Sequence, residues 1–245
     1  YYDYILLRNE KEMSLLKFLI NKHSIAIDIG ANRGKYTYIL WKLGCLVKII
    51  EPNPECLNIL KAWAQNKKNI EIHPVALSNE NGKAILNIPI DQKGVKHDSS
   101  AFISKMNNLD SQNIHVTTKT LDSFNFKNVS FIKIDVEGHE SEIIQGSVNT
   151  IKNSKPALVI EIEKRHLKNK KVKDIITYIT SMGYECFFFL DKSLYPISSF
   201  DVKIHQNIDN SLKTKNIYVN NFLFLHKSKI ELDTYSRIFK KFIHR

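Results

Sequence analysis

Apolar runs alternate with amphipathic segments along the chain, which is the pattern of strands alternating with helices. Short apolar runs, typical of buried strands, predict strands at 25–29, 46–50, 70–77, 84–90, 114–118, 129–136, 157–162, 184–190 and 217–226. Apolar positions at helical spacing predict helices at 6–19, 35–43, 53–66, 141–151, 172–182 and 232–243. The alternation therefore predicts an α/β fold whose mostly parallel sheet carries helices on both faces.

Two stretches interrupt this alternation. Residues 91–113 have little periodicity and predict a long loop, a kind of segment that is often functional. No helical pattern separates the last two strands, so they can form an antiparallel pair at the sheet edge. Residues 1–23 are predicted to form an N-terminal helical extension, and residues 24–245 a single domain.

The first apolar run ends in Asp28 and leads into a glycine turn, Gly30-Ala31-Asn32-Arg33-Gly34. Such a turn aims backbone N–H groups and a helix N-terminus at a ligand. Glu51 ends the next strand, about 20 residues after Gly30, where an acid commonly binds both hydroxyls of a ribose. Since the turn is neither Gly-x-Gly-x-x-Gly nor a Gly-Lys-Ser/Thr loop, we expect a nucleoside-containing cofactor of another kind.

Ionisable side chains gather at the ends of two later strands. Asp135, Glu137 and His139 follow the run at 129–136, and Glu161 stands near the end of the next strand. Because burying charge is unfavourable, such clustering is typical of a functional site. The alternative is that the acids and His139 only cap the start of the following helix.

The composition of the chain limits the kinds of molecule that it is expected to bind. The 245 residues carry a net charge of +11, which favours polyanions such as nucleic acid, but the lysines are spread along the chain. Nucleic acid is therefore not the favoured partner. The three cysteines are far apart, so neither a disulfide framework nor a zinc site is expected. With no apolar run long enough to span a membrane and no signal pattern, the sequence predicts a cytoplasmic protein.

At these residues the sequence resembles the FkbM-type family of S-adenosylmethionine-dependent methyltransferases. The matching stretches are 27–34, 51–54, 75–78, 120–122, 132–140, 144–146 and 156–162. The resemblance implies a Rossmann-like seven-stranded sheet of order 3-2-1-4-5-7-6, mostly parallel with an antiparallel edge strand. It also implies a cofactor half at about 24–136 and an acceptor and catalytic half at about 91–113 and 133–245.

The resemblance further implies that S-adenosylmethionine is bound around the glycine turn, with Glu51 on the ribose and Ala76 and Leu77 near the adenine. Part of the loop at 91–113 is expected to close over the cofactor. The expected cofactor-binding residues are Asp28, Gly30, Ala31, Asn32, Gly34, Glu51, Pro52, Ala76, Leu77, Ser100 and Asp135.

Family members commonly methylate hydroxyl groups, so the favoured acceptor is a small molecule, a sugar or glycoconjugate. An alcohol needs a base or a metal to become a good nucleophile. Either His139 or a carboxylate acts as the base, or Asp135 with Glu161 or Glu137 holds Mg²⁺ or Mn²⁺. We favour the base because no complete ligand set can be read from the sequence.

Two other functions stay open at this point. One is a nucleic-acid methyltransferase, although the place where such amino-methylating enzymes carry Asn/Asp-Pro-Pro-aromatic here reads Asp135-Val136-Glu137-Gly138. The other is a non-catalytic cofactor-fold partner subunit, against which the retained acids argue.

Overall fold

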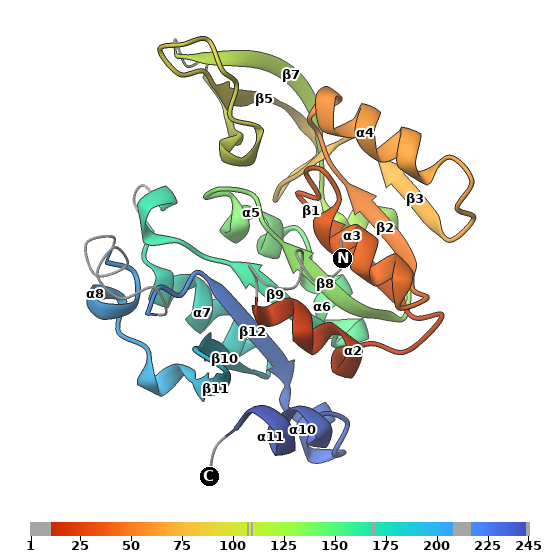
Figure 1. Ribbon diagram of the computed structural model, residues 1–245, viewed down its shortest axis with the longest axis vertical. Coiled ribbons are helices and arrows are strands. Elements are labelled where there is room, and N and C mark those ends of the chain that lie inside the picture. Colours follow the sequence, from red (N-terminus) through yellow and green to blue (C-terminus); the bar gives the residue numbers. More distant parts are fainter. Residues whose placement is uncertain (1–10, 107, 109, 168–169, 208–216, 244–245) are drawn as a thin grey trace.

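A central sheet of eight strands organises the protein, whose computed structural model describes residues 11–106, 108, 110–167, 170–207 and 217–243. The strand order is β11-β10-β12-β9-β8-β1-β2-β3 (Figure 1). These strands are β1 (Ile25–Ile29), β2 (Leu46–Ile50), β3 (Ile70–His73), β8 (Val129–Ile134), β9 (Ala157–Glu161), β10 (Tyr184–Leu190), β11 (Ser193–Pro196) and β12 (Asn221–His226). Strands β3, β2, β1, β8 and β9 are parallel, whereas β12 is antiparallel to β9 and β10.

The α/β class and the mixed sheet are confirmed, but the expected count of seven strands is wrong. Residues 193–196 form β11, which pairs antiparallel with β10 and adds an eighth strand at the edge. The last two predicted strands do pair antiparallel, yet β12 inserts between β9 and β10 and so lies inside the sheet. The short β11 carries only a few apolar residues, which is too weak a pattern to identify from the sequence.

A second sheet of four strands, with order β4-β7-β5-β6, lies beyond the carboxyl ends of the central strands (Figure 1). Its strands are β4 (Ala76–Leu77), β5 (Gly82–Pro89), β6 (Phe102–Ser104) and β7 (Ser111–Lys119). The predicted strand at 70–77 is thus divided between two sheets, and Pro74, which has no N–H to donate, stands at the division. The loop predicted at 91–113 is wrong in part, because it contains β6 and the start of β7.

Helices cover both faces of the central sheet, as predicted. The α-helices are α2 (Leu16–Leu19), α3 (Lys35–Lys42), α4 (Pro54–Ala64), α5 (Glu140–Gln145), α6 (Val148–Ser154), α7 (Val172–Ser181), α8 (Val202–His205), α10 (Lys227–Glu231) and α11 (Ser236–Phe242). Short 3-10 helices are η1 (Lys11–Leu15), η2 (Asp98–Ser100), η3 (Leu121–Phe124), η4 (Lys164–His166) and η5 (Ile197–Ser199). One core cluster joins the sheet to α5, α6 and α7, and a second joins it to α2, α3, α4 and α11.

Three predicted helices differ in detail. The helix at 6–19 is η1 followed by α2, and residues 6–10 lie outside the described residues. The helix at 141–151 is divided into α5 and α6 near Gly146, where an added Cβ would lie 2.1 Å from the carbonyl oxygen of Ser78. The tail helix predicted at 232–243 is the shorter α11, and a separate short helix, α10, precedes it at 227–231. Within the described ranges, the structure contains no helix long and apolar enough to cross a membrane.

Candidate active site

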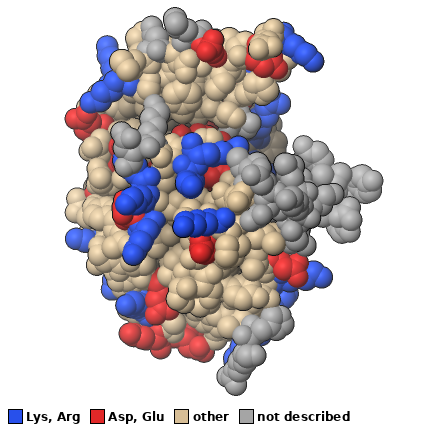
Figure 2. All heavy atoms as spheres, turned by 90° about the vertical axis from the view of Figure 1, so that its left-hand side faces the viewer, with Lys and Arg blue, Asp and Glu red and all other residues tan. Residues whose placement is uncertain are grey.

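A cavity of about 550 Å³ lies at the carboxyl ends of β1, β2, β8 and β9, where open α/β sheets bind ligands. The second sheet closes it from the other side through Leu86 and Ile103. Figure 2 shows the hollow between this sheet and the main body, with Asp and Glu atoms inside it and Lys and Arg atoms beside it. Its volume falls within the range of small-molecule and cofactor sites.

The glycine turn brings β1 against the neighbouring strand. Gly30 has a φ of +72°, and an added Cβ would lie 1.9 Å from the backbone oxygen of Asp135. Only glycine fits both the φ and this close approach. The turn therefore presents Gly30, Ala31 and Asn32 to the cavity, whereas Gly34 is absent from the cavity wall and packs against Leu60.

Asp28 ties the glycine turn to the helix that follows it. Its side chain is buried, and its Oδ2 accepts a hydrogen bond of 2.5 Å from the hydroxyl of Thr37 on α3. Burial raises the pKa of Asp28 to about 6, although the bond from Thr37 opposes this rise. The carboxylate thus fixes the start of α3 below the cavity.

Glu51 is the acid with the most direct backbone support. It is 5% exposed, and its two oxygens accept N–H bonds from Asn32 at 2.7 Å and from Asn53 at 2.8 Å. Burial raises its pKa to about 7. Because a carboxylate has about four acceptor positions, Glu51 can still accept hydrogen bonds from a ligand in the cavity.

The segment at 98–101 covers this end of the cavity. Asp98 accepts bonds from the side chain of Asn53 at 3.0 Å and from Arg33 at 3.1 Å, which hold η2 over α4 and the glycine turn. Ser100 lies in the cavity wall, as do Pro52, Ala76 and Leu77. Asp28, Glu51 and Asp135 line the same wall, so the expected cofactor-binding residues other than Gly34 are brought together.

Four expected catalytic residues, Asp135, Glu137, His139 and Glu161, line the other end of the cavity. The side chain of Asp135 is 37% exposed, and its Oδ2 lies 3.7 Å from the ammonium of Lys133. Among the acids at this end of the cavity, its side chain is the most exposed.

The side chains of Glu161 and His139 each already have a hydrogen-bonding partner within the protein. Glu161 accepts a bond of 2.8 Å from the amide of Asn220, and burial raises its pKa to about 8, with Asp135 adding to the rise. His139 Nε2 lies 3.0 Å from the hydroxyl of Ser78, and burial lowers the pKa of this imidazole. At neutral pH we therefore expect an uncharged His139 and a protonated Glu161.

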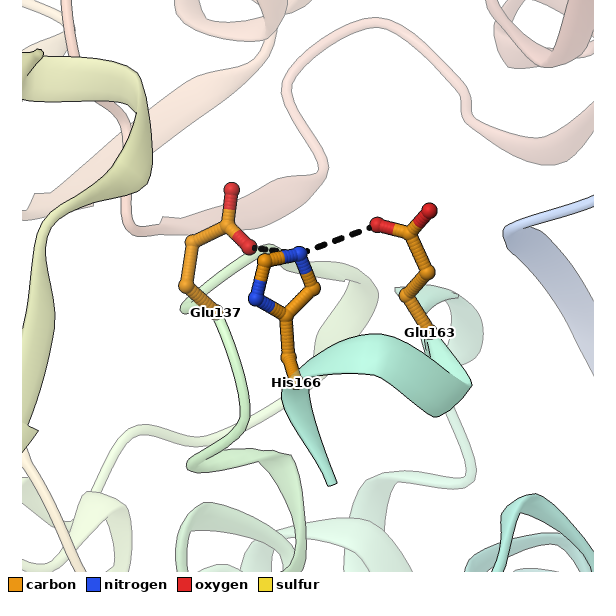
Figure 3. A group of neighbouring side chains, drawn as sticks. All are labelled: Glu137, Glu163 and His166. Atoms are coloured by element: carbon orange, nitrogen blue, oxygen red, sulfur yellow. Dashed lines mark ion pairs between the residues drawn. The ribbon is translucent and has the colours of Figure 1, made fainter. Parts of the chain in front are cut away.

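Glu137 is held in the left-handed region, with a φ of +52°, and its Oε2 lies 2.8 Å from Nε2 of His166 (Figure 3). Burial raises its pKa to about 7. The alternative to a base was a cation held by Asp135 with Glu161 or Glu137, but the group of ligand atoms that the described residues bring together is Glu137, Glu163 and His166. Sequence reasoning missed His166 and gave Glu163 no role; their i,i+3 spacing is a local signal, but the approach of Glu137 to them depends on the folded chain.

Lys133 was named only as part of a motif, yet it is 1% exposed in the middle of the site. Its ammonium donates to the Asn221 side chain at 2.8 Å and lies over the ring of Tyr36. Its place in an otherwise apolar strand could have identified Lys133 as a site residue, because buried charges are usually paired.

The profile of the Methyltransferase FkbM domain matches residues 28–186. The fold is similar to the crystal structure of methyltransferase FkbM from Methylobacillus flagellatus KT, with 16% identity and a TM-score of 0.55. That alignment covers 84% of this chain and 44% of the other, so this chain spans less than half of that protein's length.

Two further solved structures are more distant. An rRNA methylase from Streptococcus thermophilus shares 10% identity over 87% of this chain and 92% of its own, with a TM-score of 0.47. A precorrin-6y C5,15-methyltransferase from Geobacter metallireducens GS-15 shares 11% identity over 76% of this chain and 78% of its own, with a TM-score of 0.46. No curated protein matches the sequence.

Proposed function

The chain belongs to the FkbM methyltransferase family, and from this premise we propose that it is an S-adenosylmethionine-dependent O-methyltransferase. Its acceptor is a hydroxyl of a small molecule, a sugar or glycoconjugate. The observation that carries the proposal is that one cavity is lined both by the glycine turn with Glu51 and by Asp135, Glu137 and Glu161. A nucleoside-binding end and a proton-accepting end are thus joined in a single space.

The Glu51 end fits the cofactor. Glu51 is buried and fixed by two backbone N–H groups, so it can accept the two ribose hydroxyls without reorganising. The apolar side chains of Ile50, Val75 and Leu77 line the wall where an adenine would stack. When bound, S-adenosylmethionine supplies an activated methyl group. The chain's own task is to align the acceptor oxygen with that methyl group.

At the Glu161 end, Asp135 is the best placed base. It is exposed to the cavity, whereas Glu161 is bonded to Asn220 and His139 to Ser78. A general base must reach the proton that it removes, and geometry is considered before pKa. Asp135 accepts the hydroxyl proton, and Lys133, at 3.7 Å, stabilises its charge before the transfer.

The nucleic-acid alternative is favoured by one observation, the net charge of +11. The acids that line the cavity argue for a smaller acceptor, because the Asp135 carboxylate, and Glu137 where it is ionised, would face a phosphate backbone with like charge. Both acceptor classes are included in the test below.

The test combines binding and transfer. Calorimetry should detect S-adenosylmethionine binding, and labelled cofactor should transfer its methyl group to one member of a panel of nucleotide-sugars and glycolipids. A matched panel of RNA and duplex DNA serves as the control. Transfer to nucleic acid alone would contradict the acceptor class, and absence of cofactor binding would support the non-catalytic alternative.

A further inference from the structure

A cluster of metal-ligating side chains adjoins the cavity. Glu137 follows β8, Glu163 follows β9, and His166 stands in η4; their ligand atoms all lie within 4.8 Å of one another (Figure 3). His166 Nε2 is 2.8 Å from Glu137 Oε2 and 3.1 Å from Glu163 Oε2. Two segments, the turn after β8 and the stretch 163–166, thus point three donor atoms at a common place.

The side-chain atoms of this cluster lie close to one another, but their directions are not those of aligned hydrogen bonds. The side chain of Glu163 is 3% exposed. Within the described residues, neither its Oε2 nor His166 Nε2 has a hydrogen-bond partner. A single hydrogen on Nε2 could not point at two carboxylates together. Buried polar atoms are normally hydrogen-bonded, whereas Glu163 Oε2 has only ion-pair contacts, with His166 and with the exposed Arg165, and the cluster can therefore accept a further cation.

The distances fit a coordination shell. Imidazole and carboxylate ligands bind ions such as Zn²⁺ at about 2.0–2.2 Å, so neighbouring ligand atoms are about 3.0 Å apart around an octahedral ion and about 3.4 Å apart around a tetrahedral one. The observed 2.8 Å and 3.1 Å are close to the octahedral separation. One imidazole with two carboxylates suits borderline ions better than Mg²⁺, which prefers oxygen ligands and retains its waters.

We propose that Glu137, Glu163 and His166 bind one divalent transition-metal ion, of the class of Mn²⁺, Fe²⁺ or Zn²⁺, at the wall of the cavity. This ligand set shares only Glu137 with the alternative left open from the sequence, a cation held by Asp135 with Glu161 or Glu137.

The surroundings of the cluster support a bound cation. The hydroxyl of Tyr218 donates to Oε1 of Glu163 and so fixes the carboxylate while leaving Oε2 directed at His166. The guanidinium of Arg165 is the group that an ion would displace, because its Nε lies 2.7 Å from the same Oε2. The Arg165 side chain is 56% exposed and can turn toward solvent.

The role of this ion rests on the proposed function, whereas the site itself rests on geometry. Glu137 lines the cavity beside Asp135, so a cation bound to Glu137 would lie near an acceptor hydroxyl. It would lower the pKa of that hydroxyl, and the proton would pass more readily to Asp135.

The site is tested with the metal alone. Full-length protein is treated with a chelator and desalted, and Mn²⁺ and Zn²⁺ binding is measured by calorimetry, with Mn²⁺ also followed by electron paramagnetic resonance. We expect one ion per chain, bound at least tenfold more weakly in His166→Gln and Glu163→Gln. Because removing a supporting partner typically weakens metal binding about 10–100-fold, Tyr218→Phe should also bind more weakly.

Glu142→Gln is the matched control, since Glu142 forms another His–Glu contact at 3.8 Å, with His139. It should bind the ion as the unchanged protein does. Thermal melting identifies any variant that fails to fold. If Glu163→Gln fails to fold, Tyr218→Phe still tests the site. Absence of binding to both ions, or equal binding by His166→Gln, overturns the site.

S-adenosylmethionine binding by the metal-free protein separates the two proposals. A protein that binds the cofactor but neither ion overturns the metal site alone. One that binds an ion at these residues but no cofactor supports the metal site and overturns the proposed function alone.

Discussion

The two ends of the cavity hold their acids in different ways. At the Glu51 end the partners are close in sequence: Thr37 is 9 residues from Asp28, and Asn53 is 2 residues from Glu51. At the Glu161 end they come from the C-terminal strand region, where Asn220 is 59 residues from Glu161 and Asn221 is 88 from Lys133. Apart from the segment at 98–101, the first end can be assembled by one β–α–β unit, while the second requires β12 to insert into the sheet.

This difference assigns cofactor binding to the Glu51 end and methyl transfer to the Glu161 end. The Glu51 end is rigid because backbone N–H groups and a glycine turn define it, as suits a cofactor that is the same in every turnover. The Glu161 end is built from side chains contributed by β8, β9, η4 and the segment before β12. Changes at the first end should therefore alter cofactor affinity, and changes at the second should alter the rate of transfer.

The largest expected effect is at Asp135. We predict that Asp135→Ala and the isosteric Asp135→Asn each lower kcat by about 10²–10⁴-fold, the usual contribution of a general base. Cofactor affinity, measured by calorimetry, should stay nearly unchanged, because neither ribose nor adenine is expected at this end. Substantial transfer by Asp135→Asn, whose amide cannot accept the proton, would exclude Asp135 as the base.

At the opposite end, Glu51→Ala should weaken S-adenosylmethionine binding by about 10–100-fold, since a hydrogen bond to a charged group contributes about 1.5–3 kcal/mol. Calorimetry measures the loss. Glu55→Ala is the control, because Glu55 is a half-exposed acid on α4 that pairs with Lys96 at 2.6 Å. Unchanged affinity in Glu51→Ala would contradict the ribose assignment.

The same contrast explains what could be predicted from the sequence. The strands at 25–29, 46–50 and 184–190 have the predicted bounds, and Asn53 caps α4 through Glu55, because these features depend on neighbouring residues. The glycine turn, Glu51 and the acid cluster were identifiable for the same reason.

What the sequence could not reveal depends on contacts between distant segments. The pairing of β4 with β7 and the added edge strand β11 leave no local pattern, and the position of β12 between β9 and β10 was available only from the strand order that the family resemblance implied. His166 belongs to a short basic stretch of η4 that resembles a solvated loop. Only the fold shows that its ring lies between Glu137 and Glu163.

A pH series tests how the buried Glu161 carboxyl contributes to stability. Burial raises the pKa of Glu161 from 4.5 to about 8, so the folded protein retains a proton that the unfolded chain releases. This contribution to stability is complete below about pH 4.5 and is lost as the pH rises through about 8.

We therefore predict that the Tm of the ligand-free protein falls between about pH 5 and pH 9, and that Glu161→Gln flattens the fall by several degrees. Scanning calorimetry measures both slopes. Glu185→Gln, which changes an exposed acid on β10, should follow the unchanged protein. A Glu161→Gln variant with an unaltered slope would show that this carboxyl does not titrate in that window.

The smallest effect distinguishes two contacts of Asp98 at the Glu51 end. Asn53→Ala removes the cap of α4 and the bond to Asp98, so the free energy of unfolding should fall by about 1–2 kcal/mol. Arg33→Ala removes the other bond to Asp98, but the Arg33 side chain is 67% exposed, and we expect a change below about 1 kcal/mol. Urea unfolding of both variants measures the difference. If Arg33→Ala were the more harmful change, the surface ion pair rather than the buried cap would hold the segment at 98–101 over the cavity.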